Sequence, residues 1–155
     1  MAAPERERVL VSACLLGRSC RYDGGTNPDV PLRRLLAAHD LEAVPFCPEE
    51  EGGLGTPRPP AWIEREDAAA VLEGRSRVLT EDGADVTDAF RAGAQAALAA
   101  CRAAGAKRAF LKERSPSCGV CATHVAGLCV PGRGITAELL AREGIAVEGV
   151  EGRRE

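Results

Sequence analysis

The chain has 155 residues, 45% of them hydrophobic, so it has the length of one domain and enough apolar side chains for a buried core. Positive and negative side chains are mixed along the sequence and leave a net charge of −3, while aromatic residues make up only 3%. This composition argues against a nucleic-acid partner, because it offers neither a basic tract nor a row of aromatic side chains on which bases could stack. We expect one domain over residues 1–155 that acts on a small molecule.

The N-terminal segment places charged residues before an apolar run that is much shorter than the core of a signal peptide or a membrane span. No other segment of the sequence is long and apolar enough to cross a bilayer. We therefore expect a cytoplasmic protein without a membrane partner.

The first third of the chain predicts two strands separated by a helix. Residues 9–13 form a β-branched and apolar run that ends at a glycine-containing turn, as a buried strand does. Residues 31–39 carry leucines at helical spacing, and residues 43–46 form a second apolar run. Residues 52–60, with three glycines and three prolines, are expected to be a loop.

The remaining sequence continues the alternation of strands and helices. Its predicted elements are short strands at 68–72 and 77–79, a helix from 87 to 104, a strand at 109–112, a loop at 115–121, a helix at 134–143 and a strand at 145–150. Alternation of this kind is typical of an α/β fold. We predict a single three-layer domain with a mainly parallel, Rossmann-like sheet.

Seven cysteines are unusual in a chain that is expected to be cytoplasmic. A reducing compartment does not favour structural disulfides, and an odd number of cysteines cannot pair completely. Metal binding or thiol chemistry is therefore the leading explanation.

Cys14, Cys47 and Cys118 each follow a predicted strand and precede a turn. Ligands of open α/β sheets bind beyond the carboxyl ends of the strands, so these three thiols are expected at one edge of the sheet. Cysteine is also a common space-filling core residue, although three cysteines at equivalent positions make coincidence a weaker explanation. Three thiolates without an evident fourth partner suit an iron–sulfur cubane with one open iron.

The other cysteines are interpreted differently. Cys101 lies on the apolar stripe of the long predicted helix and is expected in the core, and Cys20 and Cys129 are interpreted as space-filling residues rather than ligands. Cys118 and Cys121 form a CxxC pair, but the glycines and prolines that follow leave no room for the long helix of a thioredoxin-like site. A four-cysteine zinc site would require a second CxxC pair.

Polar residues near these cysteines are candidates for acid–base chemistry. Glu49 is two residues from Cys47 and could activate water, although the spacing alone favours a solvated member of an acidic run. Ser115 and Ser117 precede Cys118 in a loop where their hydroxyl groups could hold a substrate or donate hydrogen bonds to cluster sulfurs, although Ser-Pro-Ser is also typical of an ordinary turn. Arg58 could bind an anion or simply lie on the surface.

Four segments taken in order, VSACLLGRSCRYDGG, FCPEEEGGLGTPRPPA, DVTDAF and FLKERSPSCG, resemble a bacterial family whose characterised members are thiouracil desulfidases. They extend over roughly residues 9–119, and the closing GRGITAELLAREGI also resembles the family's C-terminal helix and strand. The similarity therefore covers nearly the whole chain.

The resemblance implies a [4Fe-4S] cluster held by Cys14, Cys47 and Cys118, with the fourth iron free to take the sulfur of the substrate. The family's acidic catalytic residue falls on Glu49 and its catalytic serine on Ser115. The implied reaction is the hydrolytic, non-redox removal of sulfur from a thiolated small molecule such as 2-thiouracil.

The sequence departs from the family pattern after Gly119. Cys121, Thr123 and His124 stand where the family has small residues and a Tyr-Asp-Gly turn, and Trp62 replaces an acid. A Cys121 thiolate could occupy the open iron, which would suit a redox sensor or cluster carrier without catalysis. A zinc-binding module is the third hypothesis.

Overall fold

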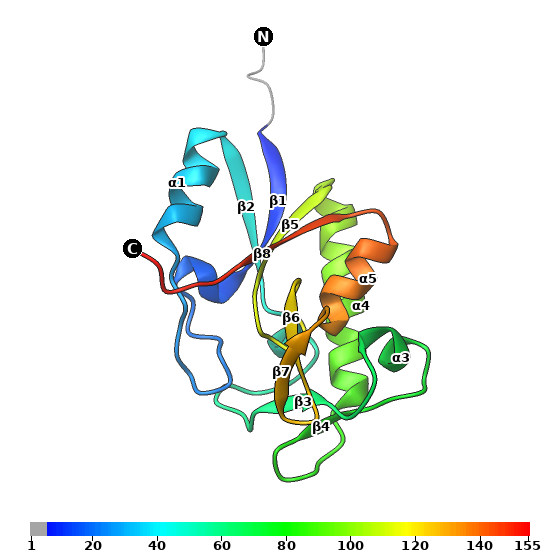
Figure 1. The fold of residues 1–155 in the computed structure, drawn as a ribbon. Coiled ribbons are helices and arrows are strands. Elements are labelled where there is room, and N and C mark those ends of the chain that lie inside the picture. The colour runs from blue at the N-terminus through cyan, green and yellow to red at the C-terminus, as the bar shows by residue number, and fades with distance from the viewer. Residues whose placement is uncertain (1–5) are drawn as a thin grey trace.

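A computed structural model describes residues 6–155 of the chain (Figure 1). The charged N-terminal segment considered above begins in the first five residues, which lie outside the described part. None of the helices in residues 6–155 has the length and apolarity that a membrane span requires.

A four-stranded parallel sheet forms the centre of the structure (Figure 1). Its strands, in the order β2-β1-β5-β8, are β1 (Glu7–Ser12), β2 (Leu41–Phe46), β5 (Arg108–Lys112) and β8 (Ala146–Val150). Strand β1 pairs in parallel with both β2 and β5, and β5 pairs in parallel with β8. The parallel α/β architecture predicted from the sequence is confirmed.

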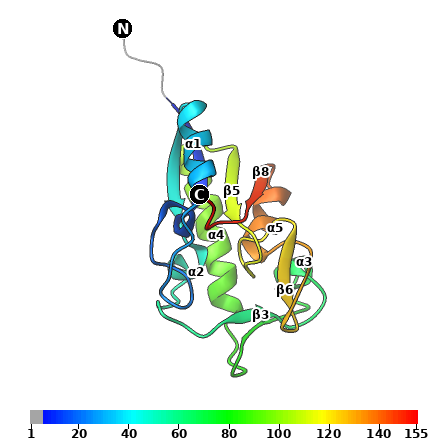
Figure 2. The same cartoon turned by 60° about the vertical axis from the view of Figure 1, so that its left-hand side comes forward.

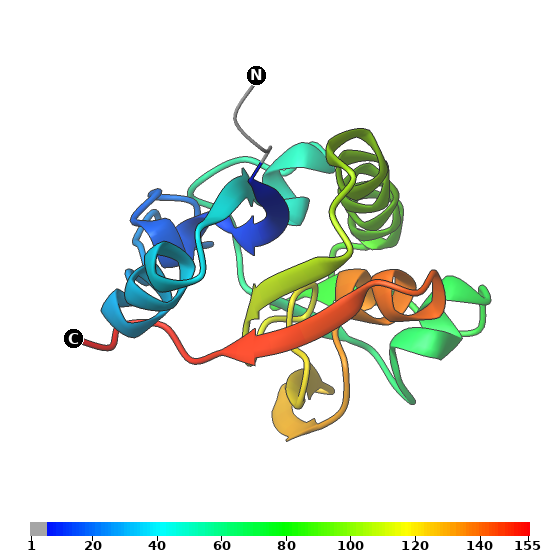
Figure 3. The same ribbon diagram turned by 90° about the horizontal axis from the view of Figure 1, so that it is seen from above.

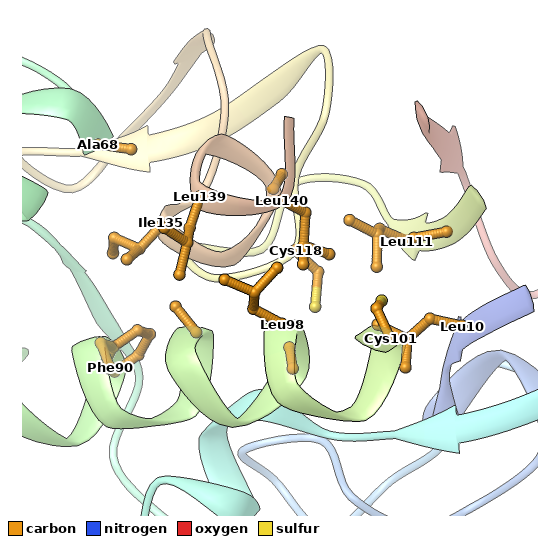
Figure 4. Close-up of a cluster of buried hydrophobic side chains, with 14 of the residues drawn as sticks. Leu10, Ala68, Phe90, Leu98, Cys101, Leu111, Cys118, Ile135, Leu139 and Leu140 are labelled. Carbon is orange, nitrogen blue, oxygen red and sulfur yellow. The ribbon is translucent and has the colours of Figure 1, made fainter. Parts of the chain in front are cut away.

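Helices cover both faces of this sheet (Figure 3). Helix α1 (Val30–Ala38) packs on one face, and helices α4 (Thr87–Ala104) and α5 (Ile135–Arg142) pack on the other. The alternation of side chains along β1 separates two cores, because Val9 and Val11 pack with α1 whereas Leu10 faces α4. The larger core, between α4 and α5, includes Leu98, Leu140 and the side chains of Cys101 and Cys118 (Figure 4).

Helix α4 follows its sequence pattern closely. Asp85 accepts hydrogen bonds from the backbone and side chain of Thr87 at the start of the helix, and Gly105, with φ of 68°, ends it in the left-handed conformation. The stripe that includes Phe90, Leu98 and Cys101 is buried, as predicted.

A second, smaller sheet lies beyond the carboxyl ends of the parallel strands (Figures 1 and 2). Its strands, in the order β4-β3-β6-β7, are β3 (Ala61–Ile63), β4 (Val78–Thr80), β6 (Ala122–Val125) and β7 (Leu128–Pro131). Only β4 corresponds to a predicted strand. The β6–β7 hairpin turns at Ala126 and Gly127, which both have positive φ, as a tight hairpin turn requires.

The expected strand at 68–72 is wrong, because this segment is the short helix α3 (Ala68–Leu72). The side chain of Asp67 accepts a hydrogen bond from the Ala70 N–H at 2.9 Å, and this cap together with three alanines favours a helical turn. Two further short elements, η1 (Ala13–Leu16) and α2 (Pro48–Glu51), follow strands β1 and β2 directly.

Asp29 connects the start of α1 to the C-terminal tail. Its fully buried carboxylate accepts hydrogen bonds from the backbone N–H groups of Leu32 at 2.9 Å and Gly152 at 3.1 Å. The Arg154 guanidinium binds both carboxylate oxygens, at 2.7 and 2.9 Å. Burial alone would raise the pKa of Asp29, but the hydrogen bonds and charge of Arg154 and the two N–H groups lower it below its ordinary value.

We predict that Asp29→Ala lowers the free energy of unfolding by about 2–3 kcal/mol, because it removes a helix cap and leaves the Gly152 N–H and Arg154 without their acceptor. The pKa of Asp29 in the folded protein lies below its ordinary value of 3.8. The stabilisation is therefore complete above about pH 3.8 and is lost as the pH falls through the pKa of the folded state. Urea unfolding at neutral and acidic pH measures both effects. The exposed pair of Arg8 and Glu42 offers the control, since Glu42→Gln should cost less than about 1 kcal/mol.

Candidate active site

A cavity of about 610 Å³ lies at the carboxyl ends of the parallel strands. Its inner wall comes from the segments that follow β1, β2 and β5, and its outer wall comes from the second sheet and the C-terminal tail. This is the edge of the sheet at which α/β folds bind their ligands.

The structure brings Cys14, Cys47 and Cys118 together in the wall of this cavity. Cys14 lies in η1 after β1, Cys47 immediately precedes α2 after β2, and Cys118 lies in the loop after β5. The three strands are neighbours in the sheet, so their carboxyl ends present the three thiols side by side. All three are free and buried, with exposed fractions of 9%, 8% and 5%.

The three thiols differ in how readily they ionise. A hydrogen bond from Cys20 lowers the pKa of Cys14 to about 7, although burial acts to raise it. The positive charge of Lys112 also lowers the pKa of Cys14. The same Cys20 thiol lowers the pKa of Cys47, and its single proton serves one of the two sulfurs at a time. Burial raises the pKa of Cys118 to about 12. Cys118 therefore requires a cation to become a thiolate near neutral pH.

Cys20 belongs to the site, although the sequence favoured a space-filling role for it. It is 3% exposed, lines the cavity and contacts the thiols of both Cys14 and Cys47. Its sulfur, the Cys47 sulfur and a Glu50 oxygen lie within 4.8 Å of one another. Cys121, by contrast, is exposed and is not among the described residues that line the cavity.

The Glu49 carboxylate is held at both oxygens inside the cavity wall. Arg58 Nε donates to Oε1 at 3.1 Å, and Ser117 Oγ donates to Oε2 at 3.0 Å. The Arg58 side chain is only 7% exposed and also donates to the Cys20 carbonyl at 2.9 Å. Arg58 is therefore a buried partner of Glu49 rather than a surface residue, and Glu49 is not simply a solvated member of an acidic run.

Ser115 lies under the turn that carries Cys118. Its Oγ accepts hydrogen bonds from the backbone N–H groups of Ser117 at 3.1 Å and Cys118 at 3.0 Å. The direct contact with Glu49 comes from Ser117, whose Oγ is also 3.6 Å from Cys118 Sγ. The Ser115 hydroxyl thus contacts the loop backbone, whereas the Ser117 hydroxyl contacts the Glu49 carboxylate.

Glu113 fixes the far side of the same loop. Its carboxylate, on a residue that is 7% exposed, accepts the N–H groups of Val120 at 2.8 Å, Cys121 at 2.9 Å and Ala122 at 3.3 Å. Burial would raise the pKa of Glu113, but these backbone hydrogen bonds lower it, which favours the charged form. A Cβ atom at Gly149 would collide with this carboxylate, so β8 needs glycine there.

The outer wall of the cavity contains two of the residues that depart from the family pattern, whereas Cys121 and Thr123 are not among the described residues that line it. Trp62 of β3 and His124 of β6 line it, and Tyr22, which is 41% exposed, adds a second aromatic ring. Trp62 and His124 come from the second sheet rather than from the segments that carry the three cysteines, so they are placed to contact a ligand in the cavity.

The residues present fit an iron–sulfur cluster with three thiolate ligands. Three free thiols from three loops face one cavity, and thiolate is the standard ligand of such clusters. Lys112 lies in the same wall and offers positive charge beside Cys14. The three cysteines would hold the cluster, and Glu49 and Ser117 would lie beside it.

A family model described as 2-thiouracil desulfurase matches residues 9–151 of the chain. The chain belongs to this family. The Bacillus subtilis (strain 168) protein YbbK is 39% identical over 142 residues, which are 90% of this chain and 93% of YbbK. A solved structure named as the [4Fe-4S]-dependent thiouracil desulfidase TudS is 44% identical, with a TM-score of 0.79 over 93% of this chain and 91% of that one. The resemblance identified from the sequence is confirmed.

The pKa differences predict which thiols of the reduced, metal-free protein react with iodoacetamide. The alkylation rate of Cys14 should rise with pH and reach half of its maximum near pH 7, the approximate pKa of this thiol. Cys118, with a pKa of about 12, should stay unmodified around neutral pH. Peptide mass spectrometry after timed labelling measures each site. The fully buried Cys101 is the control for unfolding during the labelling. Equal labelling of Cys14 and Cys118 would contradict the prediction.

Proposed function

We propose that the protein is a desulfidase that removes sulfur hydrolytically, without net oxidation or reduction, from a thiolated small molecule such as 2-thiouracil. The observation that carries this proposal is the convergence of three free cysteine thiols and a fixed Glu49 carboxylate in one cavity. Family membership and the name of the solved relative support it. We propose the cytoplasm as its compartment, because free cysteines stay reduced there.

We propose Cys14, Cys47 and Cys118 as the ligands of a [4Fe-4S] cluster. A bound cluster with three protein ligands supplies a Lewis-acidic iron with an open position and affinity for sulfur. The parallel sheet and the Glu113-bound loop hold the three thiols in place before the cluster binds.

Glu49 is the proposed general base. Arg58 and Ser117 orient its carboxylate, which leaves lone pairs on both oxygens free to accept a proton from water. Ser115 is the proposed proton donor to the substrate. Its oxygen accepts two backbone N–H groups, which stabilise negative charge that develops when the hydroxyl gives up its proton.

Anaerobic purification tests the cluster and the activity together. We predict a brown protein with about four irons per chain that converts 2-thiouracil into uracil and sulfide. Replacement of Cys14, Cys47 or Cys118 by Ser should abolish iron binding, whereas Cys129→Ser, at an exposed position, should leave it unchanged. Iron and sulfide analysis, the visible spectrum and chromatography of the product provide the measurements.

Glu49→Gln tests the general base. The substitution keeps the shape of the side chain and removes its basicity, so we predict a fall in kcat of about 10²–10⁴-fold with normal iron content. The exposed Glu51 of the same helix provides the matched control, since Glu51→Gln should retain wild-type turnover. A Glu49→Gln protein with full activity would remove Glu49 from the mechanism.

A zinc-binding module is the second candidate, because the Cys20 and Cys47 sulfurs and a Glu50 oxygen lie at mutual distances that suit one metal ion. The same metal analysis separates the candidates. Stoichiometric zinc, with no iron after cluster reconstitution, would contradict the desulfidase proposal. A redox sensor or cluster carrier with Cys121 as the fourth ligand finds no support, because Cys121 is exposed and is not among the described residues that line the cavity.

A further inference from the structure

Ser117 lies between the two residues that carry the proposed acid–base chemistry. Its Oγ donates a hydrogen bond to Glu49 Oε2 at 3.0 Å and is also 3.0 Å from Ser115 Oγ. Ser117 is 1% exposed, so these contacts lie in the protein wall rather than in bulk water. A continuous chain of hydrogen bonds therefore joins Ser115 to Glu49.

The backbone determines the direction of this chain. Ser115 Oγ accepts the N–H groups of Ser117 and Cys118, at 3.1 and 3.0 Å. A serine hydroxyl has one proton and two lone pairs, so Ser115 is left as the donor in its contact with Ser117. Ser117 in turn directs its own proton to Glu49, with the longer 3.6 Å contact to Cys118 Sγ as the alternative. Both hydroxyl protons thus point toward the carboxylate.

We infer that Ser117 is a positioning residue that relays protons between Glu49 and Ser115, an inference that rests on the proposed desulfuration. When water attacks the thiocarbonyl carbon, a C–O bond forms and Glu49 takes one water proton. That proton passes to Ser117, and both hydroxyl groups rotate. Ser115 Oγ releases one of its two backbone N–H groups, and the freed lone pair accepts the Ser117 proton while Ser115 gives its own proton to the thioamide nitrogen or the sulfur.

The second half of the reaction uses the same path. The C–S bond breaks and its electron pair leaves with sulfur, while the second water proton passes through Glu49, Ser117 and Ser115 to the departing sulfur as the carbonyl forms. The sum is one thiocarbonyl and one water converted into one carbonyl and one hydrogen sulfide, without electron transfer. Glu49, Ser117 and Ser115 end in the protonation states in which they began.

Ser117→Ala tests the relay in the cluster-loaded protein. The change removes one oxygen atom, so we predict normal iron content, a KM within about twofold of wild type and a fall in kcat of roughly 10²-fold. A curved proton inventory in mixed H₂O and D₂O, expected for wild type, should become linear. Ser117→Thr, which restores a hydroxyl, should recover part of kcat. Ser76→Ala removes a buried hydroxyl remote from the cavity and is the control.

A second measurement does not depend on turnover. In the metal-free protein labelled with ¹³C-glutamate, the carboxyl resonance of Glu49 should move in Ser117→Ala and stay in place in Ser76→Ala, because only the first change removes a hydrogen bond to Glu49. Wild-type kcat and an unmoved resonance in Ser117→Ala would overturn the relay and leave the desulfidase proposal intact. A wild-type protein that binds four irons and leaves 2-thiouracil unchanged would instead contradict the desulfuration itself.

Discussion

The parallel pairing of β1 with β2 and β5 is the constraint on which the site depends. Each strand ends in a cysteine-bearing segment, and parallel pairing places all three ends at one edge of the sheet. An antiparallel neighbour would have moved one thiol to the opposite edge, about the length of a strand away. The two cores that α1, α4 and α5 form on the faces of the sheet therefore also determine where the thiols meet.

Buried and half-buried charges are tied to specific partners around this edge. Glu49 is paired with Arg58, Glu113 accepts three backbone N–H groups, and Asp29 binds Arg154 and two N–H groups. An ionised carboxylate inside a protein is stable only with such partners, so each of them fixes the chain segments that supply its donors. The Arg58 link joins the Cys20 segment to Glu49, and the Glu113 link holds the loop of Cys118.

Sequence patterns predicted the features that depend on local periodicity. The continuous apolar run of β1 is typical of a buried parallel strand, and the apolar stripe of α4 repeats with the period of a helix, so the parallel sheet and its covering helices could be predicted. The second sheet could not be predicted beyond its strand β4, because its strands have only three or four residues and are too short to show alternation. Ser117 and Arg58 belong to the site because both donate hydrogen bonds to Glu49, which is 68 and 9 residues away along the chain, respectively. A local sequence pattern does not show contacts of this kind. The only sequence signal for Cys20 was its spacing from Cys14, and that spacing also suits an ordinary buried cysteine.

The three proposed ligands differ in how far their ionisation depends on a bound cation. A hydrogen-bonded Cys14 with a pKa of about 7 is already partly ionised in neutral solution, and Cys47 is shifted in the same direction. Cys118, with a pKa of about 12, becomes a thiolate only when a nearby positive charge offsets its burial. A cation bound by the neighbouring thiols would supply that charge. The Cys118 loop is already held by Glu113 and Ser115, so ionisation of Cys118 would require the loss of a proton rather than a rearrangement of the backbone.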